Sequence, residues 1–331
     1  MEKFYKSKKV FITGAGGFIG SHIVEELLLQ GAEVTALVHY NAFSSIGNLQ
    51  YLEPELLSKI KIEFGDVTDS FQIQKLTKGK DIILHLAALI GIPYSYVAPA
   101  TYISTNISGT LNVLEAAKTN NIEKVIITST SETYGTAIYA PIDEKHPMQG
   151  QSPYSATKIG ADKIGESYFL SFNLPVCIVR PFNTFGPRQS QRAVIPTIIN
   201  QVLHSNVIKL GSLNPVRDML YVKDTAKGFL MAAANNNTSG EVINLGTGVG
   251  YTIGQITNMI QEILGTNKEI QLDLQRIRPE KSEVFKLICD NSKAEKLIGW
   301  KPNYTLKEGL VEAINWMNRK TSDNFESKYI I

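Results

Sequence analysis

The chain has little cysteine, almost no net charge and no long apolar run, and each shortage excludes a class of protein. Two cysteines in 331 residues cannot build a disulfide framework, so a reducing cytoplasm is the expected compartment. Lys and Arg total 33 against 31 Asp and Glu, a balance that offers no field for nucleic acid or an anionic membrane. The longest apolar stretch, residues 82–93, is too short to span a bilayer.

What remains is an ordinary globular composition. Apolar residues make up 43% of the chain and charged residues 19%, which is not the composition of a disordered protein. A chain of this length buries enough surface to fold without a disulfide or a structural metal. We therefore expect either one large α/β unit or two domains.

The first half of the chain alternates strand and helix patterns. Near-continuous apolar strands separated by helices predict a doubly wound parallel sheet, the Rossmann fold class. After Pro181 the strands become short and separated, which predicts a smaller C-terminal α/β lobe. The expected boundaries are 1–180 for the first domain, completed by part of 220–250, and 181–331 for the lobe. The strands are expected at 9–13, 33–38, 60–64, 81–86, 125–128 and 176–179, then at 208–210, 242–245 and 270–274.

A glycine-rich turn follows the first predicted strand. The run GAGGFIG places a GxxGxxG pattern between a strand and a helix. Gly14 permits the tight turn, Gly17 lets the backbone approach a pyrophosphate, and Gly20 lets the helix pack on the strand. Glycine turns also occur without a ligand, but this context predicts a dinucleotide site that includes Phe18 and Ile19 at the start of the helix.

The acid that usually binds the ribose 2′-hydroxyl is missing. No Asp or Glu lies within residues 34–52, where the motif would place it. Asp66, after the third strand, is either an adenine contact or a turn residue, and the sequence leaves both open. The cofactor is NAD held without the carboxylate, or NADP with its 2′-phosphate near His39, Asn41, Ser44 and Ser45.

Two segments carry candidate catalytic groups. Tyr154 and Lys158 lie four residues apart near the start of a predicted helix and share one face, where an ammonium lowers the pKa of a phenol and makes it a usable base. Thr130 and Glu132 follow the fifth strand, at the edge of the sheet where ligands bind in this fold. Thr130 is a candidate hydrogen-bond partner of a substrate hydroxyl. Glu132 is either a second base or a solvated loop carboxylate.

Together these motifs resemble the extended short-chain dehydrogenase/reductase family, and more narrowly its NAD-dependent nucleotide-sugar epimerases and dehydratases. The resemblance extends over nearly the whole chain. It rests on GAGGFIG, YSATK, TSTSETYG (128–135), HLAA (85–88) and RPFNTFGPR (180–188). Further stretches are similar to 4,6-dehydratases of the legionaminic acid pathway, which act on a nucleotide-linked N-acetylglucosamine: YNAFSSIG, AALIGIPYSY, GQSPYSATKIGAD, RPFNTFGPRQSQRAVIPTII and RPEKSEV.

The resemblance implies a mechanism. Tyr154 removes the C4 hydroxyl proton while hydride passes to a tightly bound cofactor that is regenerated in each turnover. Glu132 then removes the C5 proton, water leaves from C6, and hydride returns there to give a 4-keto-6-deoxy sugar. Many relatives have Asp at the position of Ser131, so Glu132 serves as base and acid here, or a water assists.

Other readings stay open at this point. UDP-glucuronate decarboxylases also have Thr-Ser-Glu, which keeps that activity as an alternative. A 4-epimerase is a third option, although it needs no carboxylate at Glu132. A non-catalytic NAD(P)-binding sensor on the same fold is the alternative from a different class. Such proteins commonly lose the Tyr/Lys pair, and this chain keeps it.

The resemblance also assigns binding residues and a partner. The C-terminal lobe is expected to bind the nucleotide sugar, and the helices near 107–117 and 154–172 are expected to pair two copies into a homodimer. Arg192 is an even choice between a phosphate ligand and a surface residue. Further cofactor contacts are Val67, Leu86, Ala87, Ala88, Thr128 and Pro181. The substrate contacts are Asn183, Arg188, Val194, Arg217 and Arg278.

Overall fold

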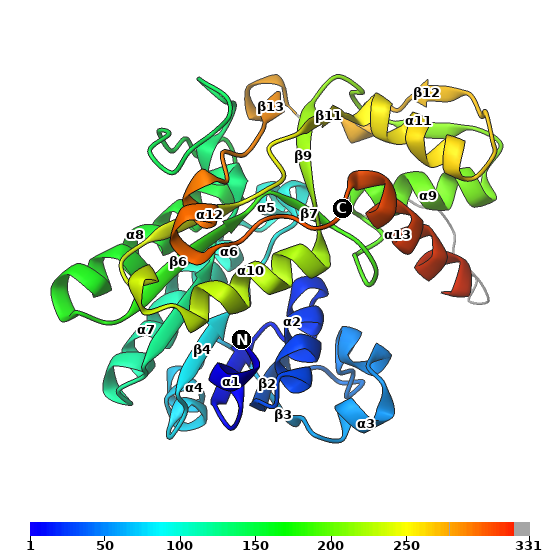
Figure 1. Ribbon diagram of the computed structural model, residues 1–331. Coiled ribbons are helices and arrows are strands. Elements are labelled where there is room, and N and C mark those ends of the chain that lie inside the picture. Colours follow the sequence, from blue (N-terminus) through cyan, green and yellow to red (C-terminus); the bar gives the residue numbers. More distant parts are fainter. Residues whose placement is uncertain (278, 321–331) are drawn as a thin grey trace.

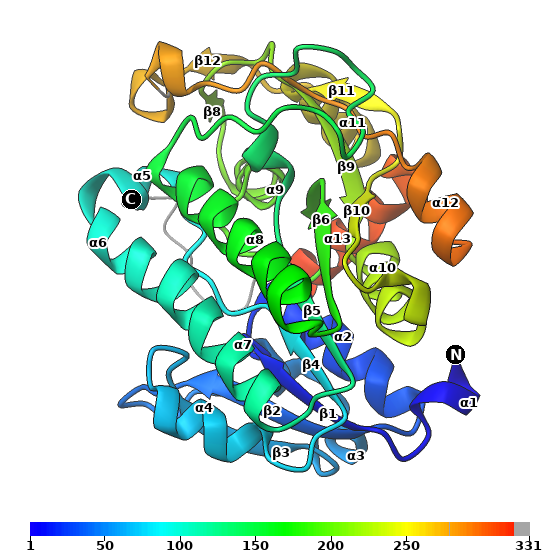
Figure 2. The same ribbon diagram turned by 90° about the vertical axis from the view of Figure 1, so that its left-hand side faces the viewer.

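Seven parallel strands form the central sheet of the protein. The computed structural model describes residues 1–277 and 279–320. The strand order is β3-β2-β1-β4-β5-β6-β10, and every neighbouring pair is parallel (Figures 1 and 2). The predicted doubly wound sheet is therefore confirmed. Its strands are β1 (Lys9–Thr13), β2 (Glu33–His39), β3 (Lys61–Gly65), β4 (Ile82–His85), β5 (Lys124–Thr128), β6 (Val176–Pro181) and β10 (Val242–Leu245).

Helices cover both faces of this sheet because its strands are apolar on both sides. One apolar core unites the sheet with residues of α1 (Glu2–Tyr5), α2 (Phe18–Leu29), α10 (Val222–Ala234) and α12 (Ser292–Ile298). A second core, on the opposite face, involves α4 (Ser70–Thr77), α7 (Gly109–Thr119) and α8 (Pro153–Phe172). Figure 2 shows α7 and α8 side by side along that face.

The C-terminal lobe has its own core and two small sheets. One sheet contains β7 (Asn183–Phe185), β9 (Val216–Tyr221), β11 (Gly250–Thr252) and β13 (Lys286–Leu287). The other pairs β8 (Ile208–Leu210) with β12 (Ile270–Leu272). Its apolar core includes residues of α9 (Val194–His204), α11 (Ile253–Ile263) and α13 (Leu306–Lys320). Strand β10 lies beside β6, so the chain leaves the lobe to complete the main sheet.

Short helical segments connect these elements. The helix predicted around Leu111 begins with a π-helical turn, η2 (Ile103–Ser108), before α7. The others are η1 (Gly47–Tyr51), α3 (Pro54–Leu57), α5 (Ile92–Val97), α6 (Pro99–Tyr102), η3 (Ser131–Tyr134), η4 (Asn236–Thr238), η5 (Leu274–Arg276) and η6 (Glu280–Ser282). Among the described helices, none has both the length and the apolar character to span a membrane.

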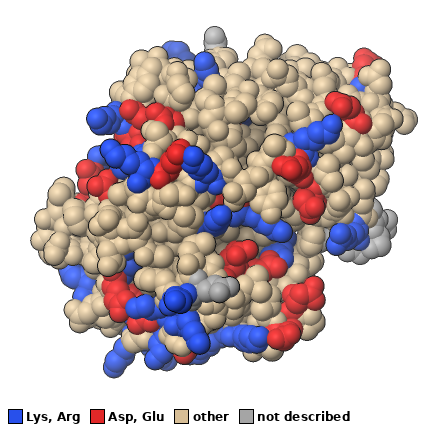
Figure 3. All heavy atoms as spheres, viewed as in Figure 1, with Lys and Arg blue, Asp and Glu red and all other residues tan. Residues whose placement is uncertain are grey.

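The strand order reverses between β1 and β4, and this reversal positions the site. Crossovers from the two strands leave on opposite faces, and in open α/β sheets ligands bind at the carboxyl ends of the strands at such a point. The glycine turn after β1, the HLAA run after β4 and the segment after β5 all begin at this edge. On the face drawn in Figure 3, Lys and Arg alternate with Asp and Glu, in keeping with the balanced composition.

Candidate active site

The glycine turn leaves space that side chains would fill. Gly14 has φ +68°, and a Cβ built there would lie 2.7 Å from the Ala87 nitrogen. A Cβ at Gly20 would lie 2.2 Å from the Gly14 oxygen. Gly17 caps α2 without any side-chain hydrogen bond, so the first N–H groups of α2 are open to an anion. This cradle fits a dinucleotide pyrophosphate.

Behind the cradle, His85 joins three elements through a chain of hydrogen bonds. The Thr13 hydroxyl accepts hydrogen bonds from the N–H groups of Leu86 and Ala87, at 3.1 Å each. It therefore donates its own hydrogen bond to His85 Nδ1, 2.8 Å away. His85 Nε2–H then donates to the Thr110 hydroxyl at 3.0 Å. Burial and the charge of Lys158 lower the His85 pKa to about 3, so the ring is neutral. This chain fixes the Leu86–Ala88 backbone beside the glycine turn.

The loop after β2, residues 40–46, borders the glycine turn and is stabilised by hydrogen bonds of the Asn41 side chain. The Asn41 amide donates to His39 O at 3.1 Å and Ser45 O at 2.9 Å, and it accepts from the N–H groups of Phe43 and Ser45. It is therefore engaged in shaping the loop, which weakens its predicted role toward a 2′-phosphate. Ser44 adopts φ +50° in the same loop. No Lys or Arg lies between residues 39 and 46.

Asp66 acts in the turn after β3. One carboxylate oxygen accepts from the N–H and hydroxyl of Thr68 at 2.8 Å each, and the other lies 3.5 Å from His39 Nδ1. The turn role left open by the sequence is thus present, and the second oxygen still faces the end of β2. Val67, the next residue, is buried against α7.

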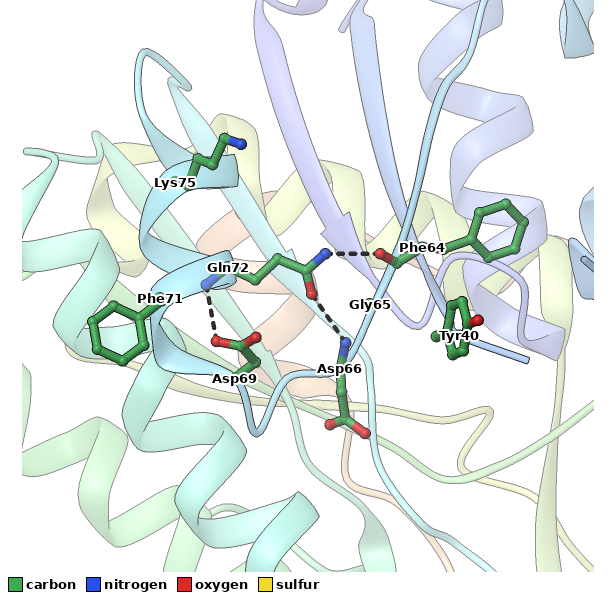
Figure 4. Close-up of a pocket in the computed structure, with 8 residues that line it drawn as sticks. All are labelled: Tyr40, Phe64, Gly65, Asp66, Asp69, Phe71, Gln72 and Lys75. Atoms are coloured by element: carbon green, nitrogen blue, oxygen red, sulfur yellow. Dashed lines mark hydrogen bonds between the residues drawn. The ribbon is translucent and has the colours of Figure 1, made fainter. Parts of the chain in front are cut away.

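A surface pocket of about 500 Å³ lies beside this turn. Figure 4 shows the Gln72 side chain bridging the Phe64 carbonyl and the Asp66 N–H, at 2.7 and 3.3 Å. A Cβ at Gly65 would lie 1.9 Å from Gln72 Oε1, so a larger residue there would displace the Gln72 side chain from this bridge. The pocket borders the expected adenosine end of the cofactor site. Its lining comprises Tyr40, Phe64, Gly65, Asp66, Asp69, Phe71, Gln72 and Lys75.

Helix α8 presents Tyr154 and Lys158 to the end of β5. The helix begins where predicted, because Ser152 and Ser155 form a reciprocal capping box around Pro153. Tyr154 forms a side-chain hydrogen bond with Thr130. The Lys158 ammonium donates to the Thr128 carbonyl at 2.6 Å. Both side chains are buried, at 7% and 4% exposure.

Burial controls the protonation of this pair. It raises the Tyr154 pKa above the ordinary value; the Thr130 hydrogen bond opposes this shift and the Glu132 charge adds to it. Burial also lowers the Lys158 pKa, against the attraction of Asp162. The expected lowering of the tyrosine pKa is therefore not present in this structure, because burial outweighs the Thr130 hydrogen bond. The phenol is protonated at neutral pH.

The segment after β5 brings the other catalytic candidates to the same place. Thr130 caps the short helix η3 by accepting the Glu132 N–H at 3.2 Å. Glu132 is partly exposed and close enough to Tyr154 for its charge to act on the phenol, whereas Ser131 is buried. The Thr128 hydroxyl oxygen is buried without a hydrogen-bond partner among the described residues. This unsatisfied hydroxyl, beside Lys158, suits a hydrogen bond to a polar group of a bound cofactor.

On the substrate side, the predicted residues differ in what they contact. The Asn183 side-chain oxygen is buried without a partner among the described residues, which fits a ligand contact. Arg217 is buried at 6% exposure, and its guanidinium lies 3.4 Å from Glu283. Val194 begins α9, and Pro181 ends β6 in a buried position. Arg192 is exposed, and Arg278 lies outside the described residues.

Arg188, a predicted diphosphate contact, is engaged with helix α2 in this structure. Its guanidinium lies 2.8 Å from the Glu25 carboxylate and donates to the Ser21 carbonyl at 3.4 Å. Both partners belong to α2, so the side chain attaches the GPR loop to that helix. Its Nε is buried without a hydrogen-bond partner among the described residues, and its role toward a diphosphate stays a prediction. The sequence does not reveal the pair because its members are far apart along the chain. Glu283, the partner of Arg217, was missed for the same reason.

Comparison with known proteins gives consistent relatives. The family model described as GDP-mannose 4,6 dehydratase matches residues 11–313. A putative UDP-glucose 4-epimerase of Methanocaldococcus jannaschii is 33% identical, over 93% of this chain and 98% of that protein. The NAD-bound UDP-glucuronic acid 4-epimerase of Bacillus cereus has a TM-score of 0.87 at 30% identity, covering 94% and 99%. The NAD-bound dTDP-glucose 4,6-dehydratase DesIV of Streptomyces venezuelae has a TM-score of 0.87 at 26%, covering 95% and 98%.

The buried neutral His85 predicts a pH dependence of stability. Below pH 6.5 the unfolded chain binds a proton at this ring that the folded protein excludes down to about pH 3. Stability present above pH 6.5 is therefore lost as the pH falls, by about 1.4 kcal/mol per pH unit from this group. We expect His85→Asn to reduce the slope of unfolding free energy against pH by that amount, as measured by urea titrations.

Thr110→Ala is the matched control, because it removes the hydrogen bond to the ring and keeps the titrating group. It should lower stability at every pH and preserve the slope. His22, whose pKa burial lowers to about 4, still contributes in both variants. An unchanged slope in His85→Asn would contradict the neutral, buried assignment.

Proposed function

Because the chain belongs to the GDP-mannose 4,6-dehydratase family of extended short-chain dehydrogenases/reductases, we propose that it is a nucleotide-sugar 4,6-dehydratase. At the coarser level it is an NAD(P)-dependent nucleotide-sugar dehydratase or 4-epimerase. The observation that favours dehydration is a second carboxylate on the segment after β5. Glu132 lies on η3, two residues after Thr130, which caps that helix, and its charge adds to the raised pKa of Tyr154. A 4-epimerase needs one proton-transfer group at the sugar, and a dehydratase needs a second one for C5.

NAD(P) held on the glycine turn supplies a hydride acceptor that also returns the hydride within one turnover. The chain's own residues supply binding and proton transfer. The Gly14–Gly20 turn and the start of α2 hold the pyrophosphate. Thr128 and Lys158 lie where the β5 end meets α8, which suits the nicotinamide half of the cofactor. Leu86 to Ala88 form the wall fixed by His85.

Tyr154 takes the proton of the C4 hydroxyl. The buried phenol holds its proton strongly, so the Thr130 hydrogen bond and the positive charge of Lys158 are what make proton transfer feasible in the loaded site. Glu132, partly exposed on η3, takes the C5 proton next to the new carbonyl and gives a proton to the C6 hydroxyl, which leaves as water. Ser131 is buried and has no acidic proton to give, so this double duty falls to Glu132. The resulting C5–C6 double bond is then saturated by the returning hydride at C6 and by a solvent-exchanged proton at C5, which gives the 4-keto-6-deoxy sugar.

The donor proposed is a GDP- or UDP-linked N-acetylglucosamine. This narrower proposal rests on the stretches similar to legionaminic-acid-pathway 4,6-dehydratases, including residues 40–47 and 180–199. Asn183 and Arg217 are the proposed contacts to the nucleotide diphosphate, and the start of α9 at Val194 lies on the nucleotide side. The proposed compartment is the cytoplasm.

We also propose a homodimer formed through α7 and α8. These neighbouring helices carry exposed apolar side chains, among them Leu111 at 39%, Leu170 at 73% and Phe172 at 52% exposure. Pairing two copies of this face buries them in a four-helix arrangement with two-fold symmetry.

Glu132→Gln tests the dehydratase assignment. The amide cannot accept the C5 proton, so we expect water loss from an N-acetylglucosamine donor to fall at least about a hundredfold, the usual loss when a general base is removed. The measurement is product formation by mass spectrometry, with the KM compared between variants. Binding of the donor should change little, because the side chain retains its size.

Glu123→Gln is the matched control. Its carboxylate pairs with Lys8 at 2.5 Å, at the opposite edge of the sheet, and the variant should dehydrate at the wild-type rate. Water loss undiminished in Glu132→Gln would remove Glu132 from the mechanism and with it the basis for preferring a dehydratase to an epimerase.

Leu111→Glu tests the dimer. A charge on this face cannot be buried unpaired, so the variant should elute as a monomer in gel filtration with light scattering, while the wild type elutes as a dimer. Leu29→Glu, at a 61% exposed position on α2, is the control and should stay dimeric. A monomeric wild type would refute the proposal.

A further inference from the structure

Helix α8 offers a third residue to the segment 129–134, one turn beyond the predicted Tyr154–Lys158 pair. Tyr154, Lys158 and Asp162 lie four residues apart and therefore share one face of the helix. Each contacts a different residue where β5 ends: Lys158 contacts the carbonyl of Thr128, the last residue of β5, Asp162 contacts Ser129, and Tyr154 contacts Thr130. Three successive turns of α8 thus hold three successive residues.

Asp162 fixes the start of the catalytic segment. The Ser129 hydroxyl donates to Asp162 Oδ2 at 2.6 Å, and the Ser129 N–H donates to the Val179 carbonyl at 2.7 Å. Ser129 immediately precedes Thr130, and both its side chain and its backbone are engaged. The position at which the chain turns away from β5 is therefore set by groups on α8 and β6.

Arg180 fixes the other end of the same segment. Its Nη1 donates to the Tyr134 hydroxyl at 2.9 Å, and the guanidinium lies over the Tyr134 ring, 5.0 Å from the centroid. The Tyr134 hydroxyl donates a hydrogen bond to the side-chain oxygen of Asn244, on β10, at 2.8 Å. Tyr134 is the last residue of η3, so this contact holds the helix that carries Glu132.

Asp162 and Arg180 also form an ion pair with each other. Arg180 donates to Asp162 Oδ2 through Nε at 3.1 Å and through Nη2 at 2.8 Å. Both side chains are 1% exposed. Asp162 Oδ2 accepts three hydrogen bonds, while Oδ1 is buried with no partner among the described residues. A buried pair that leaves one oxygen unsatisfied is a poor way to gain stability alone, because desolvation offsets much of the attraction.

We propose that the Asp162–Arg180 pair is a positioning device that holds the segment 129–134 at both ends and thereby places Thr130 and Glu132 against Tyr154. Asp162 acts through Ser129 and Arg180 acts through Tyr134. Neither contacts substrate, so both are positioning residues. The part concerning Glu132 rests on the proposed function, whereas the part concerning the conformation of the segment does not.

Tyr134→Phe separates positioning from stability. It removes the hydrogen bonds that the hydroxyl makes with Arg180 and Asn244, and it leaves the Asp162–Arg180 ion pair and the contact between guanidinium and ring in place. Tyr5→Phe is the matched control, since Tyr5 is also fully buried and its hydroxyl donates to the Leu230 carbonyl at 2.7 Å, away from the site. We expect both variants to fold with a modestly lower Tm. In Tyr134→Phe alone, kcat should fall about tenfold with KM nearly unchanged, the effect of a misplaced catalytic group.

The second readout does not depend on activity. Amide hydrogen exchange of a peptide covering residues 129–136 should be about tenfold faster in Tyr134→Phe than in the wild type and unchanged in Tyr5→Phe. Arg180→Lys should reproduce both effects, because an ammonium preserves the charge opposite Asp162 but cannot donate in two directions like the guanidinium fork.

The proposal requires both changes together. A Tyr134→Phe variant with wild-type kcat, or with wild-type exchange in residues 129–136, overturns it and leaves the pair a purely structural feature. If the wild type turns over no nucleotide sugar, the proposed function fails, and the exchange comparison by itself decides whether the pair positions the segment.

Discussion

The ammonium of Lys158 on the carbonyl of Thr128 is the contact on which the candidate site depends. It ties the first turns of α8 to the carboxyl end of β5 at 2.6 Å, in a buried place where a charged donor to a carbonyl is strong. The register of β5 with its parallel neighbours β4 and β6 sets the position of that carbonyl along the sheet. Three segments leave the sheet at this same edge and therefore lie near one another: the glycine turn after β1, residues 86–88 after β4 and residues 129–134 after β5.

Burial affects the Tyr154–Lys158 pair and His85 in different ways. Around Tyr154 and Lys158 it disfavours both charged forms, so the resting site holds a neutral phenol and an ammonium that needs its carbonyl and the nearby Asp162 charge. Around His85 it enforces a neutral ring with a defined direction of hydrogen bonding. The surroundings of Tyr154 and Lys158 leave room for a ligand to supply charge and hydrogen bonds. The hydrogen bonds of His85 are satisfied within the protein itself, and they fix the backbone after β4.

The parts of the molecule that depend on local pattern could be predicted from the sequence. The strand of residues 9–13 and the turn after it follow from an apolar run and spaced glycines, and the start of α8 follows from Ser152 and Pro153. The parts that depend on pairs distant in sequence could not. Arg188 was expected at a diphosphate because a free guanidinium suits one, but Glu25 lies within reach only once α2 is folded. The small sheet around β9 joins four short strands from separate regions, which no local periodicity reveals.

The central claim is that this site dehydrates a nucleotide sugar with Glu132 at C5. The most direct test is mass spectrometry combined with proton NMR of the products that the wild-type protein forms in deuterium oxide. GDP-N-acetylglucosamine, UDP-N-acetylglucosamine and UDP-glucuronate are supplied in separate reactions. The account predicts that an N-acetylglucosamine donor loses the mass of one water and gains one deuterium at C5. An isomer of unchanged mass, inverted at C4 and free of deuterium at C5, would contradict it and show an epimerase, and loss of carbon dioxide from UDP-glucuronate would contradict it in favour of a decarboxylase.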